Sequence, residues 1–187
     1  MSRAALRAAA VAALLCVVAS PLSAESAPKE PVGYRLDDYR SATPQTLKGA
    51  KVIDARAAHE VWAAKASVFV DVLPQPPKPK DLPPTAVWRE RPRDDIPGSV
   101  WLPDTGYGEL AAPMQHYFEE NLARVTAGEK SKSLVFYCRA NCWMSWNAAK
   151  RALALGYANV TWFPQGTDGW EKAGFPLEAR APEPRPQ

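Results

Sequence analysis

Apolar residues follow two patterns along this chain: short continuous runs, and stretches with helical spacing. The continuous runs are rich in β-branched and aromatic residues, which predicts buried strands at residues 51–54, 67–73, 96–103, 134–137 and 159–163. Apolar residues recur every three or four positions at residues 57–65, 114–125 and 144–155, which predicts amphipathic helices. A turn at residues 164–170 and a last short helix at residues 170–173 are expected to follow. Strands that alternate with helices through short loops indicate an α/β domain, with a mainly parallel central sheet flanked by helices.

Prolines interrupt this pattern in one place. Nine of the nineteen prolines lie between Pro74 and Pro103, and proline fits neither a helix interior nor a central strand. Residues 74–95 are therefore expected to form an extended, polyproline-like insertion. Three interpretations are open for it: an ordered surface loop pinned by Trp88, a flap over the cysteine loop considered below, or a docking surface for a partner protein.

Two further segments flank the predicted domain, which covers residues 49–181. Residues 25–48 are polar and contain spaced prolines, and they are expected to form an arm across the domain surface with Tyr34 and Tyr39 as its anchors. Residues 182–187 are rich in proline and are expected to be a flexible tail.

Residues 1–24 have the features of a cleaved signal peptide. Two arginines precede an apolar run that is too short to span a bilayer comfortably, and the segment ends in small residues at Ser23 and Ala24. We expect cleavage after Ala24 and export of a soluble protein to the periplasm. The residue before Cys16 is a leucine rather than a small residue, so a lipid anchor is not expected. No later stretch is apolar enough to serve as a membrane anchor.

The net charge of the chain depends on whether the predicted signal peptide is counted. The full chain has 23 lysines and arginines against 20 acidic residues, a net charge of +3. The signal peptide contains two of the arginines and no acid, which leaves 21 basic residues against 20 acidic ones. A nearly neutral chain of this kind gives no support for nucleic-acid binding.

After cleavage two cysteines remain, Cys138 and Cys142, in an oxidising compartment. A bridge between residues four apart constrains little chain, which favours a reactive, redox or ligand-binding pair over a purely structural disulfide. Cys138 follows a predicted strand and a helix begins after Cys142, so loop amides and the helix N-terminus can stabilise a thiolate or a bound anion. Asp71 ends another strand and is expected at the same carboxyl edge of the sheet.

Other side chains near the cysteines are expected to complete the site. The loop residues expected to line it are Arg139, Ala140, Asn141, Trp143 and Met144. Trp143 is expected at the rim of the site, whereas Trp146 suits core packing and site lining equally. His59 and His116 are interpreted as surface residues, so a zinc site that needs both is not expected.

Five blocks occur in a fixed order along nearly the whole mature chain. They are Val-Phe-Val-Asp71-Val, Ile96-Pro-Gly-Ser-Val-Trp-Leu-Pro, Leu-Val-Phe-Tyr-Cys138-Arg, Ala-Leu-Gly156-Tyr-Ala-Asn-Val and Gly166-Thr-Asp-Gly169-Trp170-Glu-Lys-Ala-Gly-Phe-Pro-Leu-Glu. In order and spacing they resemble a rhodanese-like domain. The loop Cys138-x-x-x-Cys142-Trp143 and the segment Gly33-Tyr-Arg-Leu-Asp-Asp-Tyr further resemble rhodanese-like proteins named for a CXXCW motif. Those proteins are associated with pyrroloquinoline quinone (PQQ)-dependent catabolism.

The resemblance implies that Cys138 is the nucleophile that carries a persulfide. It also implies a periplasmic accessory to alcohol oxidation, with components of a PQQ-dependent alcohol dehydrogenase system as partners. Three positions depart from the family pattern. Trp143 replaces the basic residue that often closes the active loop, Leu73 replaces an arginine, and Cys142 adds a second thiol. Losing the guanidinium removes a bidentate anion clamp, which argues against efficient turnover of thiosulfate.

Three functions are consistent with these residues. In a sulfurtransferase, Cys138 would carry sulfur from small sulfur species. In a thiol–disulfide redox protein, Cys138 would attack and Cys142 would resolve. In a binding module without turnover, the two thiolates would hold Cu(I), or Trp143 and Trp146 would stack on a redox cofactor such as a quinone or on a partner protein.

Overall fold

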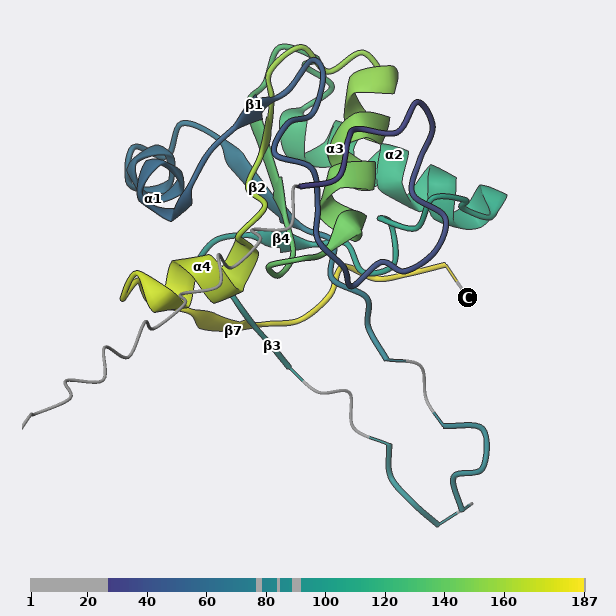
Figure 1. Cartoon of the computed structure of the whole chain (residues 1–187). Helices are drawn as coiled ribbons and strands as arrows, with labels where there is room; N and C mark the ends of the chain where they lie inside the picture. Colours follow the sequence, from purple (N-terminus) through teal and green to yellow (C-terminus); the bar gives the residue numbers. More distant parts are fainter. Residues whose placement is uncertain (1–26, 77–78, 84, 89–91, 187) are drawn as a thin grey trace, which may run out of the picture.

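The computed structural model of the chain describes residues 27–76, 79–83, 85–88 and 92–186. The predicted signal peptide, residues 1–24, lies outside them. Five strands form one parallel sheet in the order β1-β6-β5-β2-β4 (Figure 1). Their bounds are Lys51–Val52 (β1), Val160–Trp162 (β6), Leu134–Tyr137 (β5), Val68–Asp71 (β2) and Val100–Trp101 (β4). The prediction of an α/β domain with a mainly parallel sheet is confirmed.

Four helices cover the two faces of this sheet (Figure 1). Their bounds are Ala55–Ala63 (α1), Ala112–Thr126 (α2), Trp143–Ala154 (α3) and Gly166–Lys172 (α4). Successive residues of a strand point to opposite faces, and β5 shows the consequence. Phe136 packs in the cluster formed with α2 and α3, whereas Val135 and Tyr137 pack in the cluster formed with α1 and α4. The four residues of β5 are fully buried, so the strand that precedes Cys138 lies at the centre of the fold.

Two local predictions about helices need correction. Residues 166–170, expected to be a turn, already belong to α4, and Gly166 serves close packing against the backbone of Cys138 instead of a turn. On α2 the predicted stripe is confirmed at Phe118 and Leu122, and Met114 packs partly buried against the same cluster, but Tyr117 and Thr126 are buried as well. Tyr117 is buried because its hydroxyl donates a hydrogen bond to the carbonyl of Glu183 (2.9 Å) in the C-terminal segment.

That C-terminal segment makes more contacts than the expected flexible tail would. The amide of Glu183 donates to the carbonyl of Trp101 (3.0 Å), and Arg185 forms an ion pair with Asp104 (2.5 Å). Residues 182–186 therefore lie against the domain. Hydrogen bonds to the backbone of distant elements hold them there, which a local proline pattern does not reveal.

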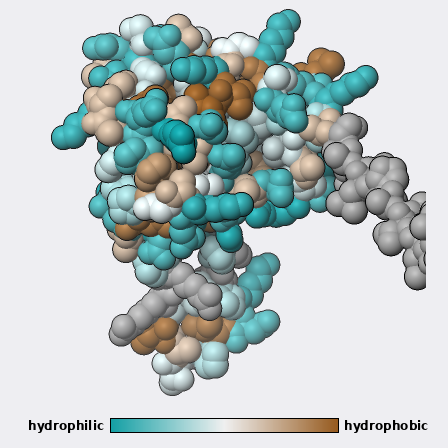
Figure 2. All heavy atoms as spheres, turned by 60° about the vertical axis from the view of Figure 1, so that its left-hand side comes forward, coloured by the Kyte–Doolittle hydropathy of each residue, from teal (hydrophilic) through white to brown (hydrophobic). Residues whose placement is uncertain are grey.

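The proline-rich insertion leaves the domain after β2 and returns through a short strand. That strand, β3 (Arg93–Asp95), pairs antiparallel with β7 (Glu178–Arg180) in a second, two-stranded sheet. After Gln75, which is still buried, the described residues 79–83 and 85–88 extend away from the body of the domain in Figure 1, and Figure 2 shows the same separate lobe. They are therefore not a flap over the cysteine loop. Within the described part of the chain, no helix is long and apolar enough to cross a membrane.

Candidate functional site: a buried cysteine pair

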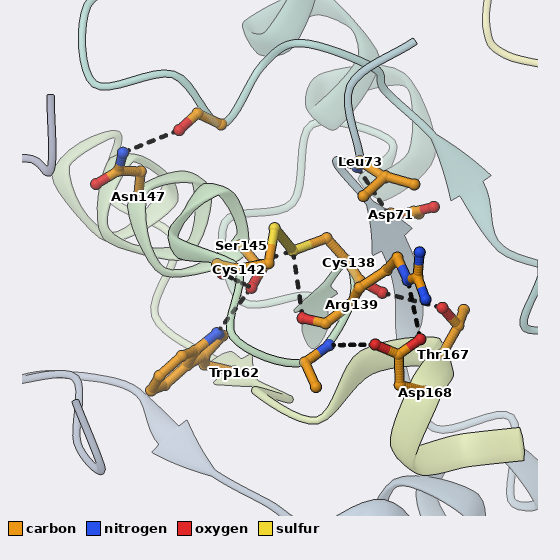
Figure 3. Close-up of a disulfide and its surroundings, with 12 residues drawn as sticks. Asp71, Leu73, Cys138, Arg139, Cys142, Ser145, Asn147, Trp162, Thr167 and Asp168 are labelled. Atoms are coloured by element: carbon orange, nitrogen blue, oxygen red, sulfur yellow. Dashed lines mark hydrogen bonds and ion pairs between the residues drawn. A yellow bond between two sulfur atoms is a disulfide. The ribbon is translucent and has the colours of Figure 1, made fainter. Parts of the chain in front are cut away.

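The first cysteine is placed by the sheet. Asp71 of β2 is the register partner of Tyr137 of β5, so Cys138 emerges at the carboxyl edge beside the end of β2. Cys142 is the N-cap residue of α3, with extended backbone dihedrals. The two cysteines form a disulfide, with Cα atoms 6.6 Å apart (Figure 3). Their exposed fractions are 0% for Cys138 and 1% for Cys142, so the pair is sealed from solvent.

Two backbone amides of the loop donate their hydrogen bonds to acceptors within the protein. The amide of Ala140 donates to the carboxylate of Asp168 (3.1 Å) in the first turn of α4, and the amide of Trp143 donates to the carbonyl of Tyr39 (2.9 Å). Such amides, together with a helix N-terminus, are the usual means of binding an oxyanion in a loop of this kind. These two amides are therefore not free to bind an anion in the oxidised loop.

Close backbone packing holds α4 against the first cysteine. The amide of Thr167 donates to the carbonyl of Cys138 (3.0 Å). A Cβ atom on Gly166 would lie 2.3 Å from that same carbonyl oxygen, and the residue has a positive φ of 51°. Glycine is therefore required at residue 166, because any side chain would push α4 away from the loop.

Arg139 is directed toward Asp168 rather than toward the sulfur atoms (Figure 3). Its Nε donates to Asp168 at 2.9 Å, and the two side chains are 50% and 33% exposed. Asp168 thus bridges the Arg139 side chain and the Ala140 amide. In the sequence Asp168 is only part of a predicted turn. Its contacts with Arg139 and the Ala140 amide depend on the packing of α4 against the loop.

A buried ion pair lies behind Cys138. The carboxyl group of Asp71 is fully buried and accepts from Nε of Arg93 at 2.7 Å. The same guanidinium donates to the carbonyl of Cys138 (3.3 Å) and to the hydroxyl of Thr167 (3.0 Å). Burial raises the pKa of Asp71, while the charge of Arg93 opposes that rise. A guanidinium is therefore present at this edge even though Leu73 occupies the family position, and it comes from the far end of the insertion.

A second buried carboxyl group belongs to the same cluster. Asp95 accepts a hydrogen bond from the hydroxyl of Tyr137, which in turn accepts from Ser99 (2.5 Å). Burial, and then the charge of Asp71, raise the pKa of Asp95 to about 8, against the opposing effects of Tyr137 and Arg93. Two buried carboxyl groups thus share one guanidinium. Because Arg93 bonds directly to Asp71, the proton that remains at neutral pH is held on Asp95.

Several predicted site residues lie elsewhere than expected. Trp143 is only 2% exposed, so the prediction that it forms an open rim is wrong. Its ring is covered by residues of the N-terminal arm. Met144 is also buried, whereas Arg139 and Asn141 are exposed, and Asn141 has a left-handed backbone (φ 51°). Trp146 is fully buried and packs in the core.

The two histidines do not converge. His116 is exposed, as predicted, and its Nε2 lies 2.9 Å from a carboxylate oxygen of Glu120. The prediction of a solvated surface is wrong for His59, whose ring stacks on Phe175 with centroids 3.9 Å apart. Among the residues that the structure describes, no group of three or more His, Cys, Asp and Glu side chains could hold a metal ion.

A parallel α/β domain with a cysteine at the junction between a central strand and a helix defines a class of proteins with thiol-based sites. The family model described as "Rhodanese-like domain" matches residues 43–173. The chain therefore belongs to the rhodanese-like family. A comparison with curated protein sequences finds no match.

Solved structures give distant likenesses. A polysulfide-sulfur transferase homodimer from Wolinella succinogenes is 14% identical, with 71% of this chain and 81% of that chain covered and a TM-score of 0.43. A rhodanese-like domain from Anabaena sp. is 16% identical, with 75% and 89% covered and a TM-score of 0.44. A protein of unknown function from Rhodopseudomonas palustris, described as a possible tyrosine phosphatase, is 22% identical, with 73% and 100% covered and a TM-score of 0.45. The family assignment rests on the family model alone.

Proposed function

We propose that this protein is an exported thiol protein that reduces sulfane sulfur, with Cys138 as the nucleophile and Cys142 as the resolving thiol. The observation that carries the proposal is the disulfide between Cys138, in the position that the resemblance assigns to the nucleophile, and a second cysteine of the same loop. A cysteine that stores a persulfide is best left without a neighbouring thiol. A cysteine that must release sulfur as sulfide benefits from one.

The reaction balances as a two-electron reduction. The Cys138 thiolate attacks a sulfane sulfur donor, takes one sulfur atom as a persulfide and expels the rest of the donor. The Cys142 thiolate then attacks Sγ of Cys138, forms the disulfide and displaces hydrosulfide. A dithiol reductant resets the pair and is itself oxidised to a disulfide. In the disulfide state the amide of Ala140 donates to Asp168 and the amide of Trp143 donates to the carbonyl of Tyr39, so neither amide retains the displaced hydrosulfide.

Intact-mass measurement of the reduced protein after exposure to inorganic polysulfide tests the cycle. The wild-type chain is expected to release sulfide and to finish as a disulfide, two hydrogen masses lighter than the dithiol. Cys142→Ser is expected to keep one extra sulfur atom, because nothing resolves its persulfide, and Cys138→Ser is the control that should acquire none. A Cys142→Ser protein that stays unmodified, or a wild-type protein that stores the persulfide, would contradict the proposal. Copper retained by the dithiol in the same spectra would favour the Cu(I)-binding alternative.

Export is the second part of the proposal, and it rests on the pattern of residues 1–24. The mature protein recovered from a periplasmic extract is expected to begin at Glu25. N-terminal sequencing checks this, and a chain that begins at Met1 would rule it out.

The cellular role that we propose is that of an accessory to PQQ-dependent alcohol oxidation. It is supported by the resemblance of the Cys138–Trp143 loop and of residues 33–39 to the CXXCW-motif proteins. Deleting the gene is expected to lower PQQ-dependent alcohol dehydrogenase activity in the periplasm. The wild-type gene should restore the activity and Cys138→Ser should not. Unchanged activity after deletion would remove this role and leave the thiol chemistry untouched.

A further inference from the structure

The N-terminal arm lies directly over the cysteine loop. The carbonyl of Tyr39 accepts the amide hydrogen of Trp143 (2.9 Å), the residue after Cys142. The hydroxyl of Ser41 accepts the indole N–H of Trp143 (3.1 Å), and the guanidinium of Arg35 lies 5.2 Å from the centre of the same indole. Trp143 is buried as a result, and residues 31–43, which we call the strap, cover this side of the site.

Side chains from one face of α3 hold the strap. Asn147 uses both ends of its amide on Arg35, accepting from the backbone N–H and donating to the backbone carbonyl, each at 2.9 Å. The ammonium group of Lys150 donates to the carbonyls of Pro31, Val32 and Gly33 at 2.7–3.1 Å. Residues 143, 147 and 150 are spaced at three and four positions, so they share a helix face.

The other edge of the strap rests on the loop at residues 105–108. The hydroxyl of Tyr39 accepts from the amide of Gly108 (3.1 Å), and its ring meets Tyr107 edge-on with centroids 5.2 Å apart. Arg151 of α3 fixes this loop by donating to the carbonyls of Thr105, Tyr107 and Gly108. The strap thus lies between α3 and a loop that α3 itself holds.

The strap differs from the other walls of the site in how it is held. The other walls are β5, α3 and α4, and separating them would expose the hydrophobic core. The strap contains no helix or strand, and two of the apolar side chains within it, Val32 and Leu36, are 101% and 59% exposed. Segments with few buried apolar contacts and polar attachments open at low free-energy cost.

We propose that the strap gates the cysteine pair, so that it must lift before a thiolate can reach either sulfur atom. A thiolate has to contact the sulfur that it attacks, and neither sulfur atom of the closed site is open to solvent. The strap is then a specificity-determining segment that slows small thiols and favours a protein reductant able to displace it. This inference rests on the proposed redox cycle, because it concerns the step that resets the disulfide.

The test measures the rate at which dithiothreitol reduces the disulfide, with no sulfur donor present. Lys150→Ala removes three hydrogen bonds from a charged donor and is expected to raise the rate about tenfold. Tyr39→Phe keeps the ring and removes the bond to Gly108, so a smaller rise is expected. Lys172→Ala, at an exposed lysine of α4, makes the same change in charge away from the strap and should match the wild type. Alkylation of free thiols and mass spectrometry give the rates.

Hydrogen exchange of the Trp143 amide supplies an independent readout, because its acceptor is the strap carbonyl of Tyr39. Exchange and reduction are expected to accelerate together in the strap variants. Unchanged reduction rates in both variants overturn the gate, whether or not exchange accelerates. The proposed function is tested separately. If it is wrong, the protein releases no sulfide from polysulfide, but the rates of reduction by dithiothreitol still show whether the strap controls access.

Discussion

Arg93→Met is expected to lower the free energy of unfolding by about 3–5 kcal/mol, the usual cost of removing one partner from a buried ion pair. The reason is the charge left behind. Asp71 is fully buried, and Arg93, itself only 12% exposed, bonds to its carboxylate at 2.7 Å. Methionine has a similar length, so the variant removes the guanidinium without opening a large void. Urea denaturation under non-reducing conditions measures the change.

Arg139→Met is the matched control for this variant. The Arg139–Asp168 pair has a similar length, 2.9 Å, but its side chains are 50% and 33% exposed. Exposed pairs of this kind contribute about 0–1 kcal/mol. Equal losses of stability in the two variants would show that the Asp71 pair is not sheltered from solvent and would contradict its place behind Cys138.

The sequence predicted the sheet well because each core strand is short, apolar and continuous. Residues 134–137 were expected to be a strand and form β5 without any shift. Asp71 and Cys138 were predicted to lie at one edge of the sheet because each lies at the carboxyl end of a parallel strand. The register confirms this, since Asp71 is the partner of Tyr137, the residue before Cys138. A parallel sheet flanked by helices leaves few other arrangements for strands so deeply buried.

The parts of the site that escaped prediction depend on contacts between distant segments. Arg93 lies 22 positions after Asp71 along the chain, and nothing in its sequence neighbourhood distinguishes it from a surface arginine. Its strand, β3, is polar and pairs with the equally polar β7, so neither has the apolar pattern that identifies a strand. Trp143 was misplaced for a related reason: its burial comes from the strap, which the chain supplies about a hundred residues earlier.

Stability is expected to fall as the pH rises from about 4 to about 8, and Asp95 is the main cause. Its ordinary pKa is 3.8 and the folded protein raises it to about 8. Between these values the folded chain binds a proton that the unfolded chain does not. The stabilisation is therefore complete below the lower value, is lost progressively between the two values and is gone once the pH has passed the upper one. Where only the folded carboxyl group holds its proton, the loss reaches about 1.4 kcal/mol per pH unit. Asp71 has a raised pKa as well and acts in the same direction.

Asp95→Asn separates this contribution from the rest of the chain. The amide cannot ionise, so the variant should lose most of the slope while Asp71 retains a smaller one. Asp94→Asn, at the exposed neighbour in β3, should keep the wild-type slope. Urea denaturation at unit steps from pH 4 to pH 9 measures the free energy of unfolding of each variant. A wild-type free energy that stays constant across this range would contradict the predicted role of Asp95. In Arg93→Met the fall of stability with pH is expected to become steeper, because neither Asp71 nor Asp95 would then have a cation to stabilise its buried carboxylate. Such a result would show that the one guanidinium stabilises both carboxyl groups.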